Sequence, residues 1–385
     1  TELAAADFQP AKELFVVDLY QKNRILHLLY YFLNLIVYIC SVYSRFVVRN
    51  EPRPRCYGYK WQEILQLKIL KPIKNFKVMK IFNFLSKAMM VVAVAIFALG
   101  VNAVEAKKGK KIGIQLYSVM SAMNKDPKGS IDRLAEMGYN VFELVQWGGN
   151  PKVFGLDAAE FKAACDAKGI NVLSTHSSLQ EDPAKEAEVM ENWRKLFAVQ
   201  KAVGGKYFVI PSYRVNYTEA EVKKMADYFN RVGKIAKEEF GLMLGYHNHS
   251  QEYKNLEGTN KVMWEYLVEN TNPEYVFFEM DVYWCTMGEK DPIAYLQKYP
   301  ERIKMLHIKD EFVIGESGKI NFEGIFKQFY KNGYKDFVVE IETPRTLRNK
   351  TNADGSKYTQ DQIAEEMFQA AKKSAEYLQN AKFVK

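Results

Sequence analysis

The sequence predicts a (β/α)₈ barrel preceded by a hydrophobic N-terminal leader, and three observations lead to this fold class. From residue 111 onward, eight short apolar segments alternate with longer amphipathic segments. Each strand–helix pair takes about 30 residues, which is the size of one βα unit. The first 106 residues lack this alternation and contain long apolar runs instead.

The composition and the charge exclude several classes of protein. The chain has 385 residues, of which 48% are hydrophobic and 26% are charged, so it is globular rather than disordered. Its four cysteines are too few for a disulfide-dense scaffold. Residues 1–106 carry 14 basic and 7 acidic side chains, whereas the other 279 residues carry 40 and 39. The net charge of +8 therefore lies in the leader, and the near-neutral remainder gives no indication of a nucleic-acid surface.

Residues 79–106 have the pattern of a secretory signal peptide. Met79 and Lys80 begin a short basic segment, an apolar run follows at residues 88–100, and Ala103 suits the small position before a cleavage site. Cleavage after Ala106 is the alternative. The apolar run is shorter than the ~20 residues that a membrane span needs. We therefore expect a periplasmic or secreted protein, with a membrane-anchored protein as the alternative.

Residues 1–78 need a separate explanation. Their apolar stretch at residues 25–43 has the length of a membrane span and is surrounded by basic residues. Two hydrophobic export-type segments in tandem would be unusual. We expect residues 1–78 to be translated upstream sequence that is absent from the natural protein, with an N-terminal membrane anchor as the alternative. The barrel domain then covers residues 107–385.

Eight segments are the predicted strands of the barrel. Each is rich in β-branched or aromatic residues and is short enough for a buried parallel strand. In chain order they are Ile112–Tyr117, Val141–Val145, Val172–His176, Tyr207–Pro211, Met243–Asn248, Val276–Asp281, Ile303–His307 and Phe337–Ile341.

The segments between these strands carry helix boundary signals. Aspartate followed by proline marks helix starts at Asp126, Asp182 and Asp291. Capping boxes begin at Asp157, Thr218 and Thr359. Glycine before the next strand marks helix ends at Gly138, Gly169, Gly204, Gly241 and Gly333.

A doubly wound open sheet is the alternative to the barrel. Such a sheet normally has a phosphate-binding glycine loop after its first strand. Here residues 116–120 read Leu-Tyr-Ser-Val-Met, without a glycine. We therefore favour the barrel.

Ionisable residues gather at the predicted carboxyl ends of the strands, where barrel enzymes hold their active sites. Four of the five histidines lie there. Buried acids and imidazoles are destabilising unless they are paired or bind a cation. The sequence therefore predicts one divalent metal ion (Mn, Co, Mg or Zn). Its predicted ligands are His247, Asp281, His307 and Glu340.

Other residues at the same strand ends are candidates for catalysis or substrate binding. The predicted catalytic residues are Glu340, His249 and Lys309. The predicted substrate-binding residues are Glu143, His176, Trp147, Glu252, Trp284, Asp310 and Glu342. For several of them the alternative is a structural role, either in support of a ligand or in packing.

Five segments resemble the xylose isomerase-like TIM barrels, specifically the sugar phosphate isomerase/epimerase group. They are residues 112–117 (IGIQLY), 245–249 (GYHNH), 279–284 (EMDVYW), 306–310 (LHIKD) and 338–340 (VVE). The resemblance covers roughly residues 110–382. It implies the barrel fold and a single divalent metal ion held by residues from strands five to eight.

The family pattern for the metal ligands is Glu, Asp, His, Glu. Its last three positions fall on Asp281, His307 and Glu340, with Glu342 as an alternative to Glu340. The strand-five position falls on His247, where the family more often has glutamate. In the family's epimerases that glutamate is also half of the acid/base pair, so histidine keeps a metal ligand but removes a carboxylate base.

The resemblance implies a sugar isomerase or epimerase that moves a proton next to a carbonyl through a metal-stabilised enediolate. Glu340, His249 or Lys309 would supply the base. The same enediolate can instead expel a leaving group. A periplasmic 3-keto-glycoside lyase or hydratase is therefore the alternative function.

Two further classes are weaker alternatives. A non-catalytic sugar-binding barrel would use the same fold, and the near-neutral charge of the barrel argues against an apurinic endonuclease. The expected partner is a small-molecule sugar or keto-sugar and not nucleic acid, and a homo-oligomer is compatible with the sequence.

Overall fold

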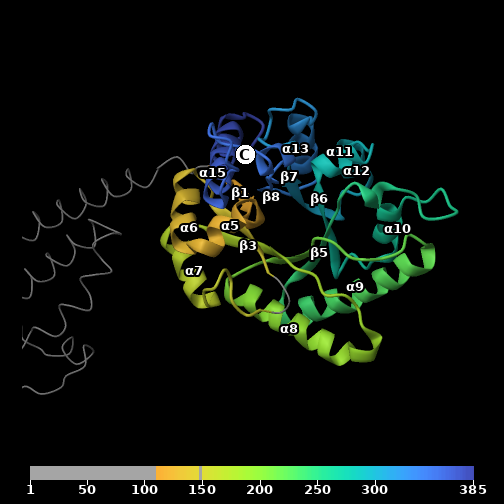
Figure 1. The fold of residues 1–385 in the computed structure, drawn as a ribbon. Helices are drawn as coiled ribbons and strands as arrows, with labels where there is room; N and C mark the ends of the chain where they lie inside the picture. The colour runs from red at the N-terminus through yellow and green to blue at the C-terminus, as the bar shows by residue number, and fades with distance from the viewer. Residues whose placement is uncertain (1–109, 147–149) are drawn as a thin grey trace, which may run out of the picture. The chain divides into compact units, whose positions relative to one another are not determined.

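The computed structural model describes residues 110–146 and 150–385. The chain divides into two units, Thr1–Lys108 and Gly109–Lys385, and the described residues belong to the second unit (Figure 1). The predicted upstream segment or anchor (1–78), the predicted signal peptide (79–106) and Trp147 lie outside the described residues. Among the described helices, none is long and apolar enough to cross a membrane.

Eight parallel strands close into a barrel with helices around its outside, which confirms the predicted fold (Figure 1). Each strand pairs with the next along the chain, and β1 pairs with β8 through Gly113 and Val338. The doubly wound alternative is wrong, because a closed sheet has no edge strands. The strands are β1 Gly113–Gln115, β2 Val141–Val145, β3 Asn171–His176, β4 Tyr207–Ile210, β5 Met243–His247, β6 Val276–Asp281, β7 Ile303–Ile308 and β8 Asp336–Val339.

The observed strands differ from the predicted ones at their ends. β2 and β6 have the predicted bounds. The predicted first strand, Ile112–Tyr117, is too long, because Leu116–Val119 forms a 3₁₀ helix (η1). The side chain of Gln115 accepts a hydrogen bond from the Tyr117 amide, which turns the backbone out of the sheet.

The helices vary widely in length. They are α5 Met120–Lys125, α6 Pro127–Glu136, α7 Ala158–Ala167, α8 Glu186–Ala202, α9 Glu219–Phe240, α10 Met263–Asn270, α11 Val282–Met287, α12 Pro292–Lys298, α13 Phe322–Lys331, α14 Arg345–Arg348 and α15 Gln360–Asn380. Two short 3₁₀ helices, η2 Pro183–Lys185 and η3 Gln251–Tyr253, complete the described elements.

Most of the predicted helix boundaries are confirmed. Asp126 and Asp291 cap α6 and α12 with their side chains, and Thr359 forms a complete capping box at the start of α15. The five glycines predicted at helix ends all have positive φ, which glycine adopts without strain at Cβ. One prediction is wrong, because Asp157 makes no capping hydrogen bond. Asp182 caps η2, which runs directly into α8.

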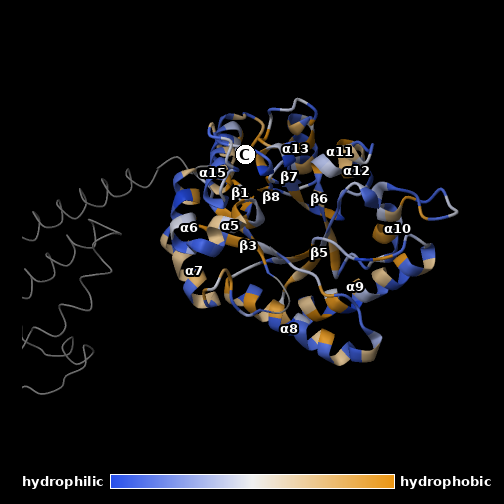
Figure 2. Ribbon diagram, viewed as in Figure 1, coloured by the Kyte–Doolittle hydropathy of each residue, from blue (hydrophilic) through white to orange (hydrophobic). Residues whose placement is uncertain are grey.

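The outer core lies between the strands and the helices. Helix α9 buries Val222, Met225, Phe229 and Val232, which are three or four residues apart and therefore lie on one side of the helix. Figure 2 shows apolar and polar residues sharing α8 and α9, as this one-sided burial requires.

The inside of the barrel holds a separate apolar cluster, which we call the apolar plug. Its buried members are Tyr207, Val209, Phe277, Met305 and Val338. Side chains two residues apart on a strand point to the same side, so Glu279 follows Phe277 and His307 follows Met305 toward the carboxyl ends. The apolar plug therefore lies directly beneath the polar side chains at the carboxyl end of the barrel.

Candidate functional site

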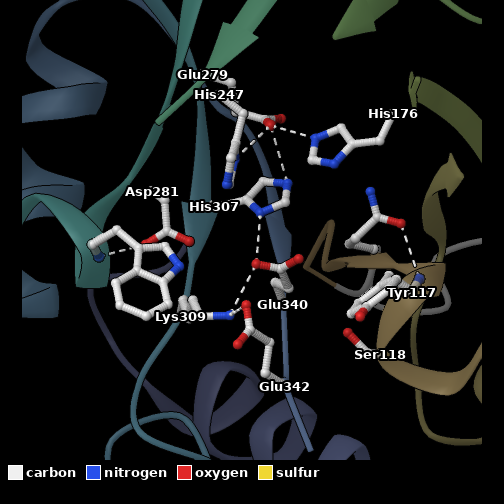
Figure 3. Close-up of polar contacts among 12 residues, drawn as sticks. Tyr117, Ser118, His176, His247, Glu279, Asp281, His307, Lys309, Glu340 and Glu342 are labelled. Atoms are coloured by element: carbon white, nitrogen blue, oxygen red, sulfur yellow. Dashed lines mark hydrogen bonds and ion pairs between the residues drawn. The ribbon is translucent and has the colours of Figure 1, made fainter. Parts of the chain in front are cut away.

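Four residues from four strands converge at the carboxyl end of the barrel, and we call them the metal cluster (Figure 3). His247 ends β5, Asp281 ends β6, His307 lies near the end of β7, and Glu340 follows β8. Each offers one ligand atom, and these atoms lie within 4.8 Å of one another. All four side chains are buried. The structure therefore brings the four predicted metal ligands together.

The metal cluster contains two polar atoms that are left without a hydrogen-bond partner among the described residues. Oδ1 of Asp281 accepts a hydrogen bond from the Trp284 amide at 2.8 Å, but Oδ2 has no partner, and neither has Nδ1 of His307. Burial raises the pKa of Asp281 to about 7. A bound cation would satisfy both atoms. Two imidazoles and two carboxylates suit Zn²⁺, Co²⁺ or Mn²⁺, so this cluster could hold a divalent metal ion.

A second group of side chains lies on the plug side of the metal cluster, around Glu279. This residue precedes Asp281 by two positions and points to the same side of β6. Its Oε2 lies 2.8 Å from Nε2 of His176, 3.1 Å from Nε2 of His307 and 3.2 Å from Nδ1 of His247. Figure 3 shows the three imidazoles around this carboxylate. Sequence analysis missed Glu279, although an acid within an otherwise apolar strand was a signal for it.

Glu143 and His176, which were predicted to bind substrate, lie beside Glu279. We call these three residues, with the imidazoles that contact them, the inner group. Glu143 is fully buried, and its Oε2 lies 2.6 Å from Nε2 of His307. Its other partners, at 2.7 and 2.6 Å, are Gln115 and Ser174. Both carboxylate oxygens of Glu143 accept hydrogen bonds from the protein, and its role in substrate binding stays a prediction. His176 likewise turns its Nε2 to Glu143 at 3.2 Å.

Charge interactions hold the inner group together. Burial alone would raise the pKa of Glu143, but the charges of His176 and His307 lower it. Burial alone would lower the pKa of His307, but Glu279 and Glu143 raise it well above its usual value. The pKa of His247 is well below its usual value, because burial and the neighbouring imidazoles both disfavour its charged form. His247 is therefore a neutral imidazole that can offer a lone pair.

Lys309 occupies the open side of the metal cluster. Its ammonium lies 3.0 Å from Oε2 of Glu340 and 2.8 Å from Oε1 of Glu342. Burial alone would lower the pKa of Lys309, but the charges of Glu340, Asp281 and Glu342 raise it above its usual value. Burial alone would raise the pKa of Glu340, but Lys309 and His307 hold it well below its usual value. Glu340 is thus an ionised carboxylate within the cluster.

His249 and Trp284 form an aromatic wall beside the metal cluster. Their ring centroids are 5.9 Å apart, and the rings of His249 and His247 are 5.0 Å apart. Nδ1 of His249 and Nε1 of Trp284 are buried and have no hydrogen-bond partner in the described part of the chain. Burial lowers the pKa of His249, so its neutral form prevails at pH 7. Both rings therefore keep a polar atom free for a bound molecule.

Glu252 and Asp310, also predicted to bind substrate, have partners within the protein. Glu252 is buried and accepts hydrogen bonds from the Tyr246 hydroxyl at 2.9 Å and the His249 amide at 2.9 Å. Asp310 is buried and accepts hydrogen bonds from the backbone amides of Glu311 and Gly315. Their carboxylates shape the chain after β5 and β7, and direct contact with a substrate stays a prediction for both residues.

Comparisons with known proteins agree with this fold. A family model described as xylose isomerase-like TIM barrel matches residues 131–373. A solved structure of a sugar phosphate isomerase/epimerase from Parabacteroides distasonis is 33% identical, with a TM-score of 0.62, and the match covers 73% of this chain and 97% of that chain. A D-psicose 3-epimerase from Clostridium cellulolyticum, solved with D-tagatose, is 16% identical, with a TM-score of 0.52 and coverage of 69% and 98%, and is similar in fold alone.

Among curated proteins, an inosose dehydratase of Bacillus cereus (strain AH820) is 30% identical over 157 residues. The match covers 34% of this chain and 51% of the relative, so the chain spans about half the length of the curated relatives it matches. The family model, in contrast, extends from α6 to α15 and includes the whole metal cluster. The closed barrel, the cluster at its mouth and this match together show that the chain belongs to the xylose isomerase-like TIM barrel family.

Proposed function

We propose that the protein is a metal-dependent enzyme that removes a proton next to the carbonyl group of a small sugar or keto-sugar. The observation that carries this proposal is the position of Glu340. Its carboxylate belongs to the metal cluster, lies 3.5 Å from Nδ1 of His307 and pairs with Lys309 at 3.0 Å. An ionised base within a site for an electrophilic ion is what this chemistry requires. The sugar-modifying relatives support the same substrate class.

The ion would be held by the metal cluster, through the imidazoles of His247 and His307 and the carboxylates of Asp281 and Glu340. Its identity among Mn, Co, Mg and Zn stays a prediction. When bound, a divalent ion polarises the carbonyl and stabilises the negative charge that develops on its oxygen.

Three residues at the mouth of the barrel have separate roles in the proton transfer. Glu340, kept ionised by Lys309, accepts the proton from carbon. Lys309 donates two of its three N–H groups to Glu340 and Glu342 and has no third ion-pair partner among the described residues, so the remaining N–H can bind a substrate oxygen. His249 is the second candidate base, because its ring is neutral and its Nδ1 is unpaired within the described residues.

Of the two outcomes of proton removal, we favour elimination of a β-substituent over isomerisation. An epimerase needs acid/base groups on both faces of its substrate. On β5 the chain has His247, whose Nδ1 lies 3.2 Å from Glu279, instead of a carboxylate. Elimination needs one base and one group that stabilises the departing oxygen, and the ammonium of Lys309 can do this by donating a hydrogen bond. A 3-keto-glycoside lyase or hydratase would use this chemistry, and the inosose dehydratase relatives support it.

A sugar isomerase or epimerase is the second candidate. The observation in its favour is the description of the 33% identical relative as a sugar phosphate isomerase/epimerase. His249 would then supply the second acid/base group in place of the missing carboxylate.

The test is to incubate the full chain with keto-sugars and 3-keto-glycosides in D₂O, with and without Mn²⁺ or Co²⁺. NMR follows the proton on the carbon next to the carbonyl, and chromatography follows the leaving group. Loss of that proton with formation of a C=C bond and release of the leaving group supports elimination, whereas deuterium at that carbon or in a rearranged sugar without release supports isomerisation. Absence of both outcomes with metal contradicts the proposal. Glu340→Gln should lose the reaction, and Glu366→Gln, in an exposed ion pair, is the matched control.

A further inference from the structure

Glu279 and Glu143 lie behind the imidazoles of the metal cluster, on the side of the apolar plug. We propose that these two carboxylates are positioning residues, which decide which ring nitrogen His307 and His247 each turn toward the metal. The inference rests on the metal centre of the proposed function, but it does not depend on the sugar or on the reaction.

His307 is held most closely from one side. Its Nε2 lies 2.6 Å from Oε2 of Glu143 and 3.1 Å from Oε2 of Glu279. Nδ1, on the other side of the ring, makes no hydrogen bond in the described structure and lies 3.5 Å from Oε2 of Glu340, the neighbouring member of the metal cluster. An ionised carboxylate only accepts hydrogen bonds, so Nε2 must carry a proton. In the neutral ring the lone pair then lies on Nδ1, the nitrogen available to the metal cluster.

His247 is held in the opposite sense. Its Nδ1 lies 3.2 Å from Oε2 of Glu279, so a proton shared between these two atoms occupies Nδ1 and leaves Nε2 as the ligand atom. Glu279 therefore acts on both imidazole ligands at once. Metal-binding histidines commonly donate their second N–H to a carboxylate, which fixes the tautomer and the orientation of the ring.

His176 completes a closed arrangement that we call the carboxylate–imidazole ring. Its Nε2 lies 2.8 Å from Glu279 and 3.2 Å from Glu143, so two acids and two imidazoles alternate across four strands. The rings of His176 and His307 are stacked, with centroids 4.9 Å apart and planes 8° apart. The side chains of this ring are buried, so water does not compete for its hydrogen bonds.

The donors around Glu143 fit the same arrangement. Ser174 donates to its Oε1 at 2.6 Å, and Gln115 donates to its Oε2 at 2.7 Å. Donors from β1 and β3 therefore fix the position of the Glu143 carboxylate. A carboxylate fixed in this way can also fix the orientation of the His307 imidazole.

A second ion within this ring is the rival interpretation, because His176, His247, Glu279 and His307 also offer ligand atoms within 4.8 Å of one another. Hydrogen bonding accounts for the contacts without an ion. Each of the three imidazoles turns one nitrogen to a carboxylate, and a neutral imidazole has one proton to donate. The number of ions bound per chain separates the two interpretations.

The experiment compares Co²⁺ binding to the metal-free full chain and to Glu279→Gln, by titration and visible absorption. Glutamine keeps the size of the side chain but cannot accept hydrogen bonds from three imidazoles. The affinity for Co²⁺ should fall about 10–100-fold, and the spectrum should change because the ligand geometry changes. Glu143→Gln should act in the same direction. Glu265→Gln, which removes a remote carboxylate with two side-chain donors, should change neither readout.

Wild-type affinity and an unchanged spectrum in Glu279→Gln would overturn the inference. So would two ions per wild-type chain, because the group of His176, His247, Glu279 and His307 would then be an ion site itself. Thermal unfolding of the metal-free variants shows whether each one folds. If Glu279→Gln does not fold, Glu143→Gln is used for the test in its place. Wild-type binding by Asp281→Asn would instead refute the metal centre of the proposed function, which keeps the two failures distinct.

Discussion

The ammonium group of Lys309 lies 3.0 Å from Oε2 of Glu340, and the lysine is only 2% exposed. Solvent therefore screens this ion pair very little. Lys309 also pairs with Glu342, and its Nζ lies 5.6 Å from the centroid of the Trp284 ring. One buried cation thus connects both carboxylates that follow β8 with the aromatic wall of the mouth.

Lys309→Met should lower kcat/KM by about 100-fold or more, because the proposed base loses the charge that keeps it ionised. The pKa of Glu340 then rises, so activity is lost first at low pH and the acidic limb of the pH–rate profile moves to higher pH. Stability should fall by about 3 kcal/mol, since a buried charge loses its partner. Lys350→Met, which breaks an exposed pair with Glu366, is the control. A wild-type profile would contradict the role of Lys309.

Metal binding should stabilise the protein, and Asp281→Asn should abolish that effect. A ligand at 100 times its Kd adds about 2.7 kcal/mol to the free energy of unfolding. The metal-free variant should be at least as stable as the metal-free wild type, because Oδ2 of Asp281 is buried without a partner among the described residues. Denaturant unfolding with Mn²⁺ and with a chelator measures both quantities. A metal-dependent gain in the variant would exclude Asp281 as a ligand.

Gly245→Ala should weaken metal binding as well as stability. A Cβ at this position on β5 would lie 2.6 Å from Cζ of Phe277 and 3.1 Å from Cγ2 of Val209, inside the closed barrel. Overpacking of this kind costs about 1–3 kcal/mol. The strand would shift and carry His247 with it. Leu244→Ala is the matched control, because it should destabilise the outer core and leave the affinity for Co²⁺ nearly unchanged.

Glu265 should make stability depend on pH in the acidic range. Burial alone would raise its pKa, but hydrogen bonds from Lys298 and Tyr295, at 2.7 and 2.8 Å, lower it. A carboxyl whose pKa is lowered by folding stabilises the protein above its unfolded pKa of about 4.3. Glu265→Gln should lower the free energy of unfolding by about 1 kcal/mol at pH 7.

The stability difference between the wild type and Glu265→Gln should shrink as the pH falls through the lowered pKa of the folded state. Urea unfolding at a series of pH values between 7 and 3 measures it. A difference that stays constant over this range would show that the charge of Glu265 does not contribute.

Trp193→Ala should be among the most destabilising substitutions in the outer core. The side chain is fully buried, and its Nε1 donates a hydrogen bond to the Tyr228 hydroxyl at 2.7 Å. The loss of an aromatic side chain of this size costs about 3–5 kcal/mol. Trp193→Phe should cost less, since it keeps a ring against Phe197. Equal losses in the two variants would contradict packing as the cause.

The barrel and the metal cluster were predictable because their signals are local. Apolar strand segments, aspartate and threonine caps and glycine helix ends depend on a few neighbouring residues. Once eight βα units were recognised, Asp281 and His307 had to face the same end, since the carboxyl ends of parallel strands meet there.

The contacts of the inner group do not follow from such local signals. The sequence places Glu143 on a strand, but its partners come from β1, β3 and β7. Glu252 was expected to face a substrate, yet the turn after β5 directs it to Tyr246 and to the His249 amide. Neither outcome follows from spacing along the chain.

Taken alone, the order of residues determined the number of strands, the end of the barrel that carries the ionisable groups and the four candidate ligands. Only the closed barrel decided which of the other polar side chains reach the mouth and which nitrogen of His307 faces Glu143. The reason is that secondary structure arises from neighbours in sequence, whereas hydrogen bonds across a barrel depend on strand register and on the direction of each side chain after closure.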